Sequence, residues 1–443
     1  MRQLRRTLTT ISLALCAALP AFAAATDTTN VAPMQHVSWS RNANIYEVNI
    51  RQYTPEGTFK AFAQHLPRLK KMGVDILWLM PIQPIGEKNR KGTLGSYYAV
   101  RDYTAVNPEF GTLDDLKALV KQAHGLGMHV IIDWVANHTA FDNPWTKEHT
   151  DWYLKNDKGD IYPVTYTDGA EPEYWTDVTG LDWSKPGLWK GMTDAMLYWV
   201  READVDGFRC DVAGKVPTPF WNQARAELDR VKPVFMLAEA DKPELHEHAF
   251  DMTYGWDTKD LFKAVAKGKA DARTLADFVA HPPKAFPPGA YRMRFTSNHD
   301  ENSWAGSDTE LYGPAFKAMA VLAATLPGMP LLYGGQESGL DKRIQFFEKD
   351  TIQWKNYAYA PFYTHLLALK HANPALWNGQ YGGPVQVLET GNDKVFAFRR
   401  TLSGNSVQVT VNVSNDAQRF TLPGGKPEML AAWDYRIDAP RKP

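Results

Sequence analysis

The chain alternates between short runs of consecutive apolar residues and longer segments in which apolar residues recur at helical spacing. Apolar runs predict strands at residues 43–50, 74–81, 128–135, 205–212, 233–240, 291–300 and 328–335. The segments 58–73, 112–127, 187–203, 219–231 and 313–326 have the spacing of helices. Buried strands that alternate with helices are typical of a parallel sheet covered on both faces. About eight such units fit an α/β fold, a (β/α)8 TIM barrel, better than an open sheet.

Two segments interrupt this alternation. Residues 138–185, rich in Asp, Tyr, Trp and Pro, form an insertion after the third strand, and long insertions in compact domains are usually functional. From residue 379 to 443 the pattern changes to short alternating strands separated by Gly-containing turns, which predicts a C-terminal antiparallel β domain. The barrel itself is therefore expected in two parts, 24–137 and 186–378.

The first 23 residues have the pattern of a secretory signal peptide. Arginines at positions 2, 5 and 6 precede an apolar run too short to span a membrane, and Ala21-Phe22-Ala23 provides a small-x-small cleavage site. Leu15 before Cys16 argues against a lipoprotein site, and after cleavage Cys210 is the only cysteine, so no internal disulfide can form. We expect a periplasmic or extracellular protein that starts near Ala24.

The composition is that of a soluble globular protein. The 443 residues are 44% hydrophobic and carry a formal net charge of -1, which gives no support for a nucleic-acid or membrane partner. The 15 tryptophans and 19 tyrosines suit a ligand with both apolar and polar faces, although some of them must belong to the core. The oligomeric state stays open.

Polar residues gather at the carboxyl ends of the predicted strands. The third strand ends at Asp133, the fourth contains Arg209 and Asp211, the fifth leads to Glu239, and the seventh leads to residues 298–300. Residues i and i+2 of a strand share a face, so Arg209 and Asp211 point into one space. Because catalysis in such barrels occurs at this end, the converging carboxylates indicate an active site.

Four of these segments, in order, carry a family resemblance. "DWVANH" (133–138), "GFRCD" (207–211), "AEA" around Glu239 and "SNHD" (297–300) resemble the motifs of the α-amylase family of retaining α-glucoside hydrolases. The resemblance covers nearly all of the mature chain. It implies that Asp211 is the nucleophile, Glu239 the general acid/base and Asp300 the transition-state stabiliser. It also implies the residues that hold the sugar, which are Tyr98 under the ring and His138, Arg209 and His299 around it.

The residues themselves agree with these roles. Glycoside hydrolysis needs one ionised carboxylate and one that carries a proton. Arg209 on the same strand face is expected to keep Asp211 ionised. Glu239 follows the apolar run "VFMLA", and an apolar surround favours the protonated form.

Some positions depart from the family pattern. Gly214 and Lys215 stand where the best-known amylases have Lys-His, and Ala240 stands where the residue is often large. The sequence therefore does not predict which residues contact the leaving group. No organic cofactor is expected. The family's calcium site would use Asn137 together with aspartates of the insertion, and here calcium and an ordinary solvated loop are equally supported.

We therefore predict a hydrolase of α-1,4-glucosidic bonds in starch-derived glucans or maltodextrins. Gly95 stands where exo-acting relatives place an acidic residue, three positions before Tyr98, and this favours internal cleavage. The alternatives are an exo-acting α-glucosidase or an α-glucan transglycosylase at the same site. A non-catalytic glucan-binding protein is a third reading, which the presence of all three carboxylates disfavours.

Overall fold

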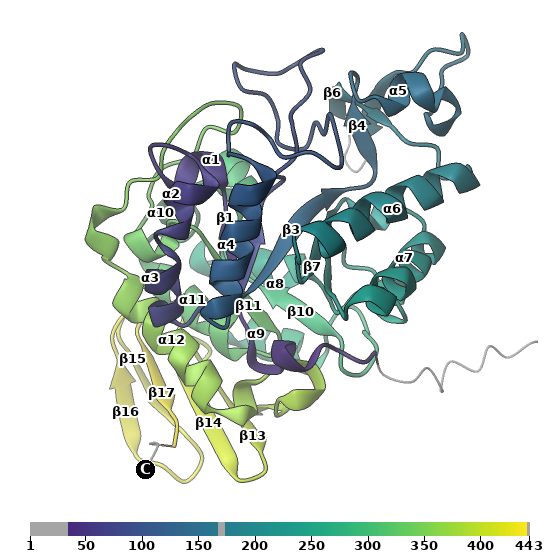
Figure 1. Ribbon diagram of the computed structural model, residues 1–443. Helices are drawn as coiled ribbons and strands as arrows, with labels where there is room; N and C mark the ends of the chain where they lie inside the picture. The colour runs from purple at the N-terminus through teal and green to yellow at the C-terminus, as the bar shows by residue number, and fades with distance from the viewer. Residues whose placement is uncertain (1–33, 167–172, 441–443) are drawn as a thin grey trace, which may run out of the picture. The chain divides into compact units, whose positions relative to one another are not determined.

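The computed structural model describes residues 34–166 and 173–440, which belong to one compact unit (Figure 1). The predicted signal peptide, residues 1–23, lies outside the described residues.

Eight parallel strands close into a barrel in the order β1-β2-β3-β7-β8-β9-β10-β11, with β11 paired to β1. The strands are β1 (Ile45–Val48), β2 (Ile76–Leu79), β3 (His129–Val135), β7 (Gly207–Asp211), β8 (Phe235–Ala238), β9 (Met252–Tyr254), β10 (Tyr291–Arg294) and β11 (Met329–Tyr333). This confirms the predicted barrel. The sequence pattern did not reveal β9, because a strand of only three residues is too short to show a period.

Side chains alternate between the inside and the outside of the barrel. Ile45, Ile131 and Phe235 belong to one buried cluster inside it, whereas Tyr46 and Ile132 belong to the cluster packed under the helices. Because both faces of each strand are buried, the strands are apolar along their length.

Helices connect the strands and surround the barrel (Figure 1). The connecting α-helices are α1 (Ile50–Tyr53), α2 (Phe59–Ala63), α3 (Leu66–Met72), α4 (Leu113–Gly125), α6 (Pro186–Glu202), α7 (Thr218–Val231), α8 (Trp256–Ala266), α9 (Ala272–Ala280), α10 (Asp308–Tyr312) and α11 (Phe316–Thr325), and α12 (Ala360–Ala372) follows β11. Thr112 caps α4, since its side chain accepts a hydrogen bond from Asp115 N.

The insertion after β3 builds a small antiparallel sheet in the order β4-β6-β5. Its strands are β4 (His138–Ala140), β5 (Pro163–Tyr166) and β6 (Glu173–Gly180), and a short helix, α5 (Trp145–Glu148), lies between β4 and β5. Since β4 begins three residues after β3 ends, the insertion starts at the carboxyl end of the barrel.

The C-terminal segment forms antiparallel sheets, as predicted. One sheet has the order β12-β13-β14-β17, with β12 (Val385–Leu388), β13 (Val395–Leu402), β14 (Asn405–Asn412) and β17 (Tyr435–Asp438), and the other pairs β15 (Gln418–Thr421) with β16 (Pro427–Leu430). Arg400 on β13 is 1% exposed and joins this sheet to the barrel. Its guanidinium donates to the carbonyl oxygens of Gly383 (2.9 Å), Thr325 (3.1 Å) and Trp377 (3.1 Å).

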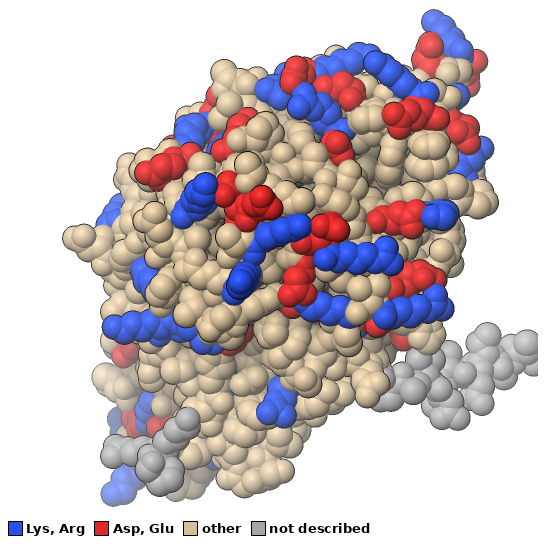
Figure 2. Space-filling model, viewed as in Figure 1, with Lys and Arg blue, Asp and Glu red and all other residues tan. Residues whose placement is uncertain are grey.

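The surface has the mixed character expected from the near-zero net charge. Figure 2 shows basic and acidic side chains interspersed over the visible face. Within the described ranges, no helix combines the length and the apolar character needed to cross a bilayer.

Candidate active site

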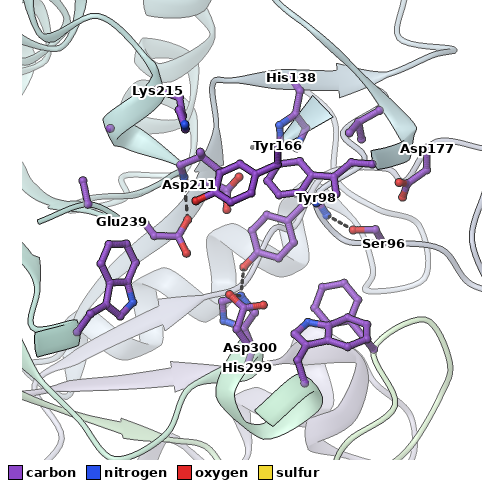
Figure 3. A pocket seen from close by; sticks show the side chains of 18 of the residues that line it. Ser96, Tyr98, His138, Tyr166, Asp177, Asp211, Lys215, Glu239, His299 and Asp300 are labelled. Atoms are coloured by element: carbon purple, nitrogen blue, oxygen red, sulfur yellow. Dashed lines mark hydrogen bonds and ion pairs between the residues drawn. The ribbon is translucent and has the colours of Figure 1, made fainter. Parts of the chain in front are cut away.

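A cavity of about 880 Å³ opens at the carboxyl ends of the barrel strands, within the range typical of ligand sites (Figure 3). Six predicted site residues line it: Tyr98, His138, Asp211, Glu239, His299 and Asp300. The structure thus brings together side chains that are up to 202 positions apart in the sequence. Arg209, the seventh, lies beneath the cavity floor and is 0% exposed.

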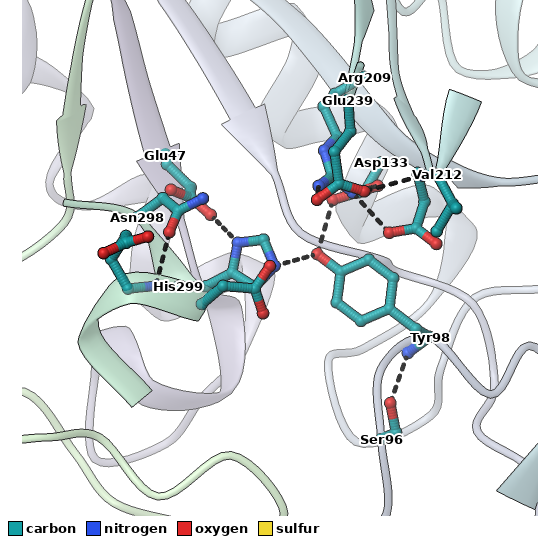
Figure 4. Close-up of polar contacts among 12 residues, drawn as sticks. Glu47, Ser96, Tyr98, Asp133, Arg209, Val212, Glu239, Asn298 and His299 are labelled. Carbon is teal, nitrogen blue, oxygen red and sulfur yellow. Dashed lines mark hydrogen bonds and ion pairs between the residues drawn. The ribbon is translucent and has the colours of Figure 1, made fainter. Parts of the chain in front are cut away.

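Arg209 connects three carboxylates (Figure 4). Its Nη1 lies 2.9 Å from Asp133 Oδ1 and 2.9 Å from Asp211 Oδ1, and its Nη2 lies 2.9 Å from Glu239 Oε1. Its Nε donates to the Tyr254 hydroxyl at 3.1 Å. A planar guanidinium holds several carboxylates in fixed positions better than a single ammonium. The buried Arg-x-Asp pair therefore fixes the positions of two of the predicted catalytic groups.

Glu239 has a second fixed contact next to this one. Its Oε2 accepts a hydrogen bond from Val212 N at 2.8 Å. Val212 directly follows Asp211 and has φ 44° and ψ 36°, a left-handed conformation that is costly for a β-branched residue. The strained backbone turns this N–H toward Glu239. The sequence predicted an apolar environment for Glu239, and this prediction is wrong. Strand β8 ends at Ala238, and the Glu239 carboxyl group faces Val212 N and the Arg209 guanidinium.

The protonation of Asp211 also differs from the sequence expectation. Burial raises the pKa of Asp211 well above its ordinary value, and the facing Glu239 raises it further, while Arg209 lowers it. Arg209 thus acts on the pKa of Asp211 in the expected direction, but burial and Glu239 outweigh it. Two carboxyl groups that share one guanidinium and face each other favour holding a proton between them.

A chain of polar contacts runs from Asp133 to the first barrel strand. Tyr98 donates its hydroxyl proton to Asp133 Oδ2 at 3.0 Å and lies 2.8 Å from His299 Nε2. His299 Nδ1 lies 2.5 Å from Oε1 of Glu47, which is 0% exposed on β1. Burial lowers the pKa of His299, but Asp300 and Glu47 outweigh it and raise the pKa to about 9. His299 is therefore an imidazolium at neutral pH.

Asp300 and His138 complete the cavity wall. Asp300 Oδ2 lies 3.3 Å from His299 Nε2, and its side chain is 44% exposed toward the cavity. His138 lies edge-on to Trp175 at 5.5 Å, and burial lowers its pKa to about 4. A neutral imidazole can both donate to and accept from a sugar hydroxyl.

The structure accounts for the small residues near the catalytic groups. Gly214, Lys215 and Ala240 line the cavity, and Lys242 lies across them with its Nζ donating to Gly214 O at 2.7 Å. A Cβ at Gly214 would lie 3.3 Å from Ala240 Cβ and 3.4 Å from Lys242 Cε. Lys242 thus fills the space that a larger side chain would need.

Gly95 does not leave an opening in the cavity wall. Its φ is +77°, and an added Cβ would lie 2.7 Å from Ile85 Cγ2 and 3.0 Å from Arg90 Cγ. The position faces packed side chains, so the argument from Gly95 for an open cleft is wrong.

Asn137 stands apart from the cavity lining, and its amide lies 3.2 Å from His138 Nδ1. Of the aspartates that could accompany it, Asp142 accepts a hydrogen bond from Glu87 N at 2.8 Å. Across the part of the chain that the structure describes, no three His, Cys, Asp or Glu side chains form a metal-binding group. The described residues therefore do not fit a calcium site built from clustered carboxylates.

Sequence reasoning missed several residues of the site. Glu47 is a buried acid near the end of an apolar strand, the same pattern that marked Asp133, and it could have been found in this way. Trp78 donates its indole N–H to Asp133 Oδ2 at 3.1 Å, and Lys91 and Asp177 line the cavity. These three come from a strand interior, a loop and the insertion, where the sequence gives no local indication of a site.

Two carboxyl groups held side by side at the carboxyl end of a (β/α)8 barrel are compatible with the two carboxylates that glycoside hydrolysis uses. The family model "Alpha amylase, catalytic domain" matches residues 21–268. The chain belongs to the α-amylase family.

Individual relatives agree with this assignment. The chain is 28% identical to the α-amylase MalA of Haloarcula japonica over 91% of its own length and 60% of that protein. Among solved structures, an α-amylase from Lactobacillus plantarum is 32% identical with a TM-score of 0.78 and covers 86% of this chain and 91% of its own. The maltogenic α-amylase AmyB from Thermotoga neapolitana is 31% identical with a TM-score of 0.78, at 90% and 96% coverage. The chain spans about three fifths of the length of the first curated relative.

Proposed function

We propose that the protein hydrolyses α-1,4-glucosidic bonds in starch-derived maltodextrins by double displacement with retention of configuration. The observation that carries this proposal is the pairing of Asp211 and Glu239 on the two Nη atoms of one buried Arg209. Retaining glycosidases need a nucleophilic carboxylate and an acid/base carboxyl group held close together. Family membership and the α-amylase relatives support the same reaction.

In the first step, an Asp211 oxygen attacks C1 of the glucose unit while the bond from C1 to the glycosidic oxygen breaks. As Asp211 becomes ionised for the attack, the proton that the pair shares moves to Glu239, and Glu239 passes it to the departing oxygen. In the second step, Glu239 takes a proton from water, the water oxygen attacks C1, and Asp211 is released as a carboxylate. Asp300 stabilises the positive charge that develops at C1 in both steps.

The test is release of reducing sugar from maltodextrin by the purified protein and by the variants Asp211→Asn and Glu239→Gln. Both variants should lose nearly all activity, whereas Asp194→Asn, in an exposed ion pair on α6, should not. Proton NMR of fresh products should show the α-anomer first. Equal inertness of all four proteins on every α-glucan would support the glucan-binding reading instead, and β-product appearing first would contradict double displacement.

Cleavage of bonds inside the chain, rather than removal of single glucose units, remains our proposal for the mode of attack. It no longer rests on Gly95. Support comes from Tyr166 and Trp175, which line the cavity with stacked rings 5.2 Å apart and suit further glucose units. The Thermotoga relative is named maltogenic, which also fits products longer than glucose. Glucose as the only early product from a long maltodextrin would overturn this mode.

Transfer to a second sugar is the alternative reaction at the same site. Maltosyltransferases are among the relatives, one of them 32% identical over 66% of this chain. Products longer than the substrate would identify transfer, and their absence would favour hydrolysis. We also propose export through residues 1–23, and N-terminal sequencing of protein from the native host would show a start near Ala24.

A further inference from the structure

One end of the cavity is bounded by an ion pair that joins two separate segments of the chain. Lys91 Nζ lies 3.2 Å from Asp177 Oδ1, and both residues line the cavity. Lys91 belongs to the loop between β2 and α4, and Asp177 belongs to β6 of the insertion. The Asp177 side chain is 6% exposed and the Lys91 side chain 33% exposed, so the pair is only partly open to solvent.

This pair lies on the side of the cavity away from the acid/base. In Figure 3, Asp177 and Glu239 stand at opposite sides of the drawn pocket, with Tyr98 between them. In the proposed mechanism Glu239 gives its proton to the departing oxygen, so the leaving-group side is the side of Glu239, where Gly214, Ala240 and Lys242 also line the cavity. The Lys91–Asp177 pair therefore belongs to the glycone side, toward the non-reducing end of a bound glucan.

The wall on this side continues from Lys91 to a third segment. Residues 91–95 are hydrogen-bonded to the loop after β11, with Leu94 N donating to Phe347 O at 3.1 Å and Thr93 N donating to Glu348 Oε1 at 2.9 Å. The Lys91 loop is thus joined to the loop after β11 by hydrogen bonds and to β6, at the cavity, by the ion pair.

An aromatic surface leads up to this wall. Phe346 is nearly parallel to Tyr98, with ring centroids 6.2 Å apart, and Trp304 packs against Phe346 at 5.3 Å. All three rings line the cavity, and Trp304 is 55% exposed. Rings of this kind suit the apolar faces of sugars, while an ammonium and a carboxylate suit their hydroxyl groups.

We infer that the Lys91–Asp177 ion pair closes the glycone end of the cleft and limits how many glucose units bind beyond the cleaved bond. This rests on the proposed function and narrows it. The terminal sugar meets the ion pair, which contacts its hydroxyls and leaves no path for a longer chain. The proposed cleavage inside the chain is thereby narrowed to the bond at one fixed distance from the non-reducing end, and the enzyme should release one short oligosaccharide of fixed length.

The experiment follows early products from maltoheptaose that carries a chromophore on its reducing end. Wild type should release one predominant short unlabelled product. Lys91→Ala and Asp177→Ala should lengthen the longest unlabelled product by one glucose unit or more. The exchanged double variant, Lys91→Asp with Asp177→Lys, re-forms the pair and should restore the wild-type length. Lys117→Ala, in an ion pair with Glu202 outside the cavity lining, is the matched control and should leave the products as they are.

The outcomes separate this inference from the proposed function. A continuous spread of products from wild type, or variants with the wild-type product length, would overturn the inference while hydrolysis stands. No reducing sugar from wild type on any α-glucan would overturn the proposed function, and the inference with it. Lys91 is the more exposed partner, so Lys91→Ala still gives an answer if Asp177→Ala does not fold.

Discussion

Replacing Glu47 by Gln should change the pH dependence of the enzyme through His299. Tyr98 has one hydroxyl proton and donates it to Asp133, so His299 Nε2 must donate to the Tyr98 oxygen. On the other side of the ring, Nδ1 faces the Glu47 carboxyl group at 2.5 Å and donates there. Both ring nitrogens are donors at once only in the imidazolium, so the chain of hydrogen bonds requires a charged His299.

The magnitude follows from the raised pKa. The pKa of His299 is about 9 instead of 6.5, a difference of about 2.5 pKa units. At about 1.4 kcal/mol per unit, the charged form stabilises the folded state by about 3 kcal/mol. Because the folded-state pKa is raised, this contribution is complete below about pH 6.5 and is lost as the pH rises through about 9.

Glu47→Gln keeps the shape and removes one of the two charges that raise the pKa, leaving Asp300. We expect the pKa of His299 to fall by about one unit, and the alkaline limb of kcat/KM to move down with it. The loss of stability with rising pH should begin at lower pH. Burial raises the pKa of Glu47, so removing this carboxylate also removes a desolvation cost, and the diagnostic quantity is the pH dependence rather than the stability at one pH.

The assay measures kcat/KM on a chromogenic maltooligosaccharide and, separately, the free energy of unfolding in urea. Both are measured from about pH 5 to about pH 10, a range that includes the ordinary and the raised pKa of His299. Glu202→Gln is the control, because Glu202 is 48% exposed and pairs with Lys117, which is 37% exposed. Its profile should match wild type. An alkaline limb of Glu47→Gln that coincides with wild type would refute the assignment of His299 as an imidazolium held by Glu47.

Three further changes test other parts of the structure. Val212→Gly should raise the free energy of unfolding by about 1 kcal/mol, because it relieves backbone strain and the gain is partly offset by chain entropy. The same change should lower kcat, because Glu239 is held less firmly. Unchanged stability in urea would count against strain at Val212. Tyr98→Phe should lower kcat/KM about 10- to 100-fold by removing a hydrogen bond to a buried carboxylate, and wild-type kinetics would contradict this. Asp251→Ala should cost about 3–5 kcal/mol in urea unfolding, because it removes the buried carboxylate that pairs with both Arg225 and His36 and leaves Arg225 with only the partly exposed Asp229. A loss near zero would show that these pairs contribute little.

The barrel could be predicted because its strands are buried on both faces, and the site could be predicted because polar residues interrupt the strands at one end. Asp211 and Glu239 follow directly from this pattern. Their protonation could not be predicted from neighbours in sequence, because the groups that decide it meet only in the fold. Val212 N contacts a carboxylate 27 positions away, and Glu47 contacts an imidazole 252 positions away.

The cleft walls were harder still to predict. Gly95 was interpreted as an opening because the sequence shows the missing side chain but not Ile85 and Arg90, which fill its place. Lys91 and Asp177 are two ordinary charges 86 positions apart, and only the fold shows that they meet across the cavity. Specificity of this kind depends on loop placement, which a single sequence does not encode locally.

The guanidinium of Arg400 has a consequence for how the molecule can be divided. It gives its protons to three carbonyl oxygens that lie outside its own strand, at Thr325, Trp377 and Gly383. A chain shortened before β13 would lose these three hydrogen bonds and would expose to water the barrel surface that the sheet now covers. The C-terminal sheet is therefore expected to melt together with the barrel in one calorimetric transition, and a version trimmed to the catalytic barrel should be recovered mainly as aggregate.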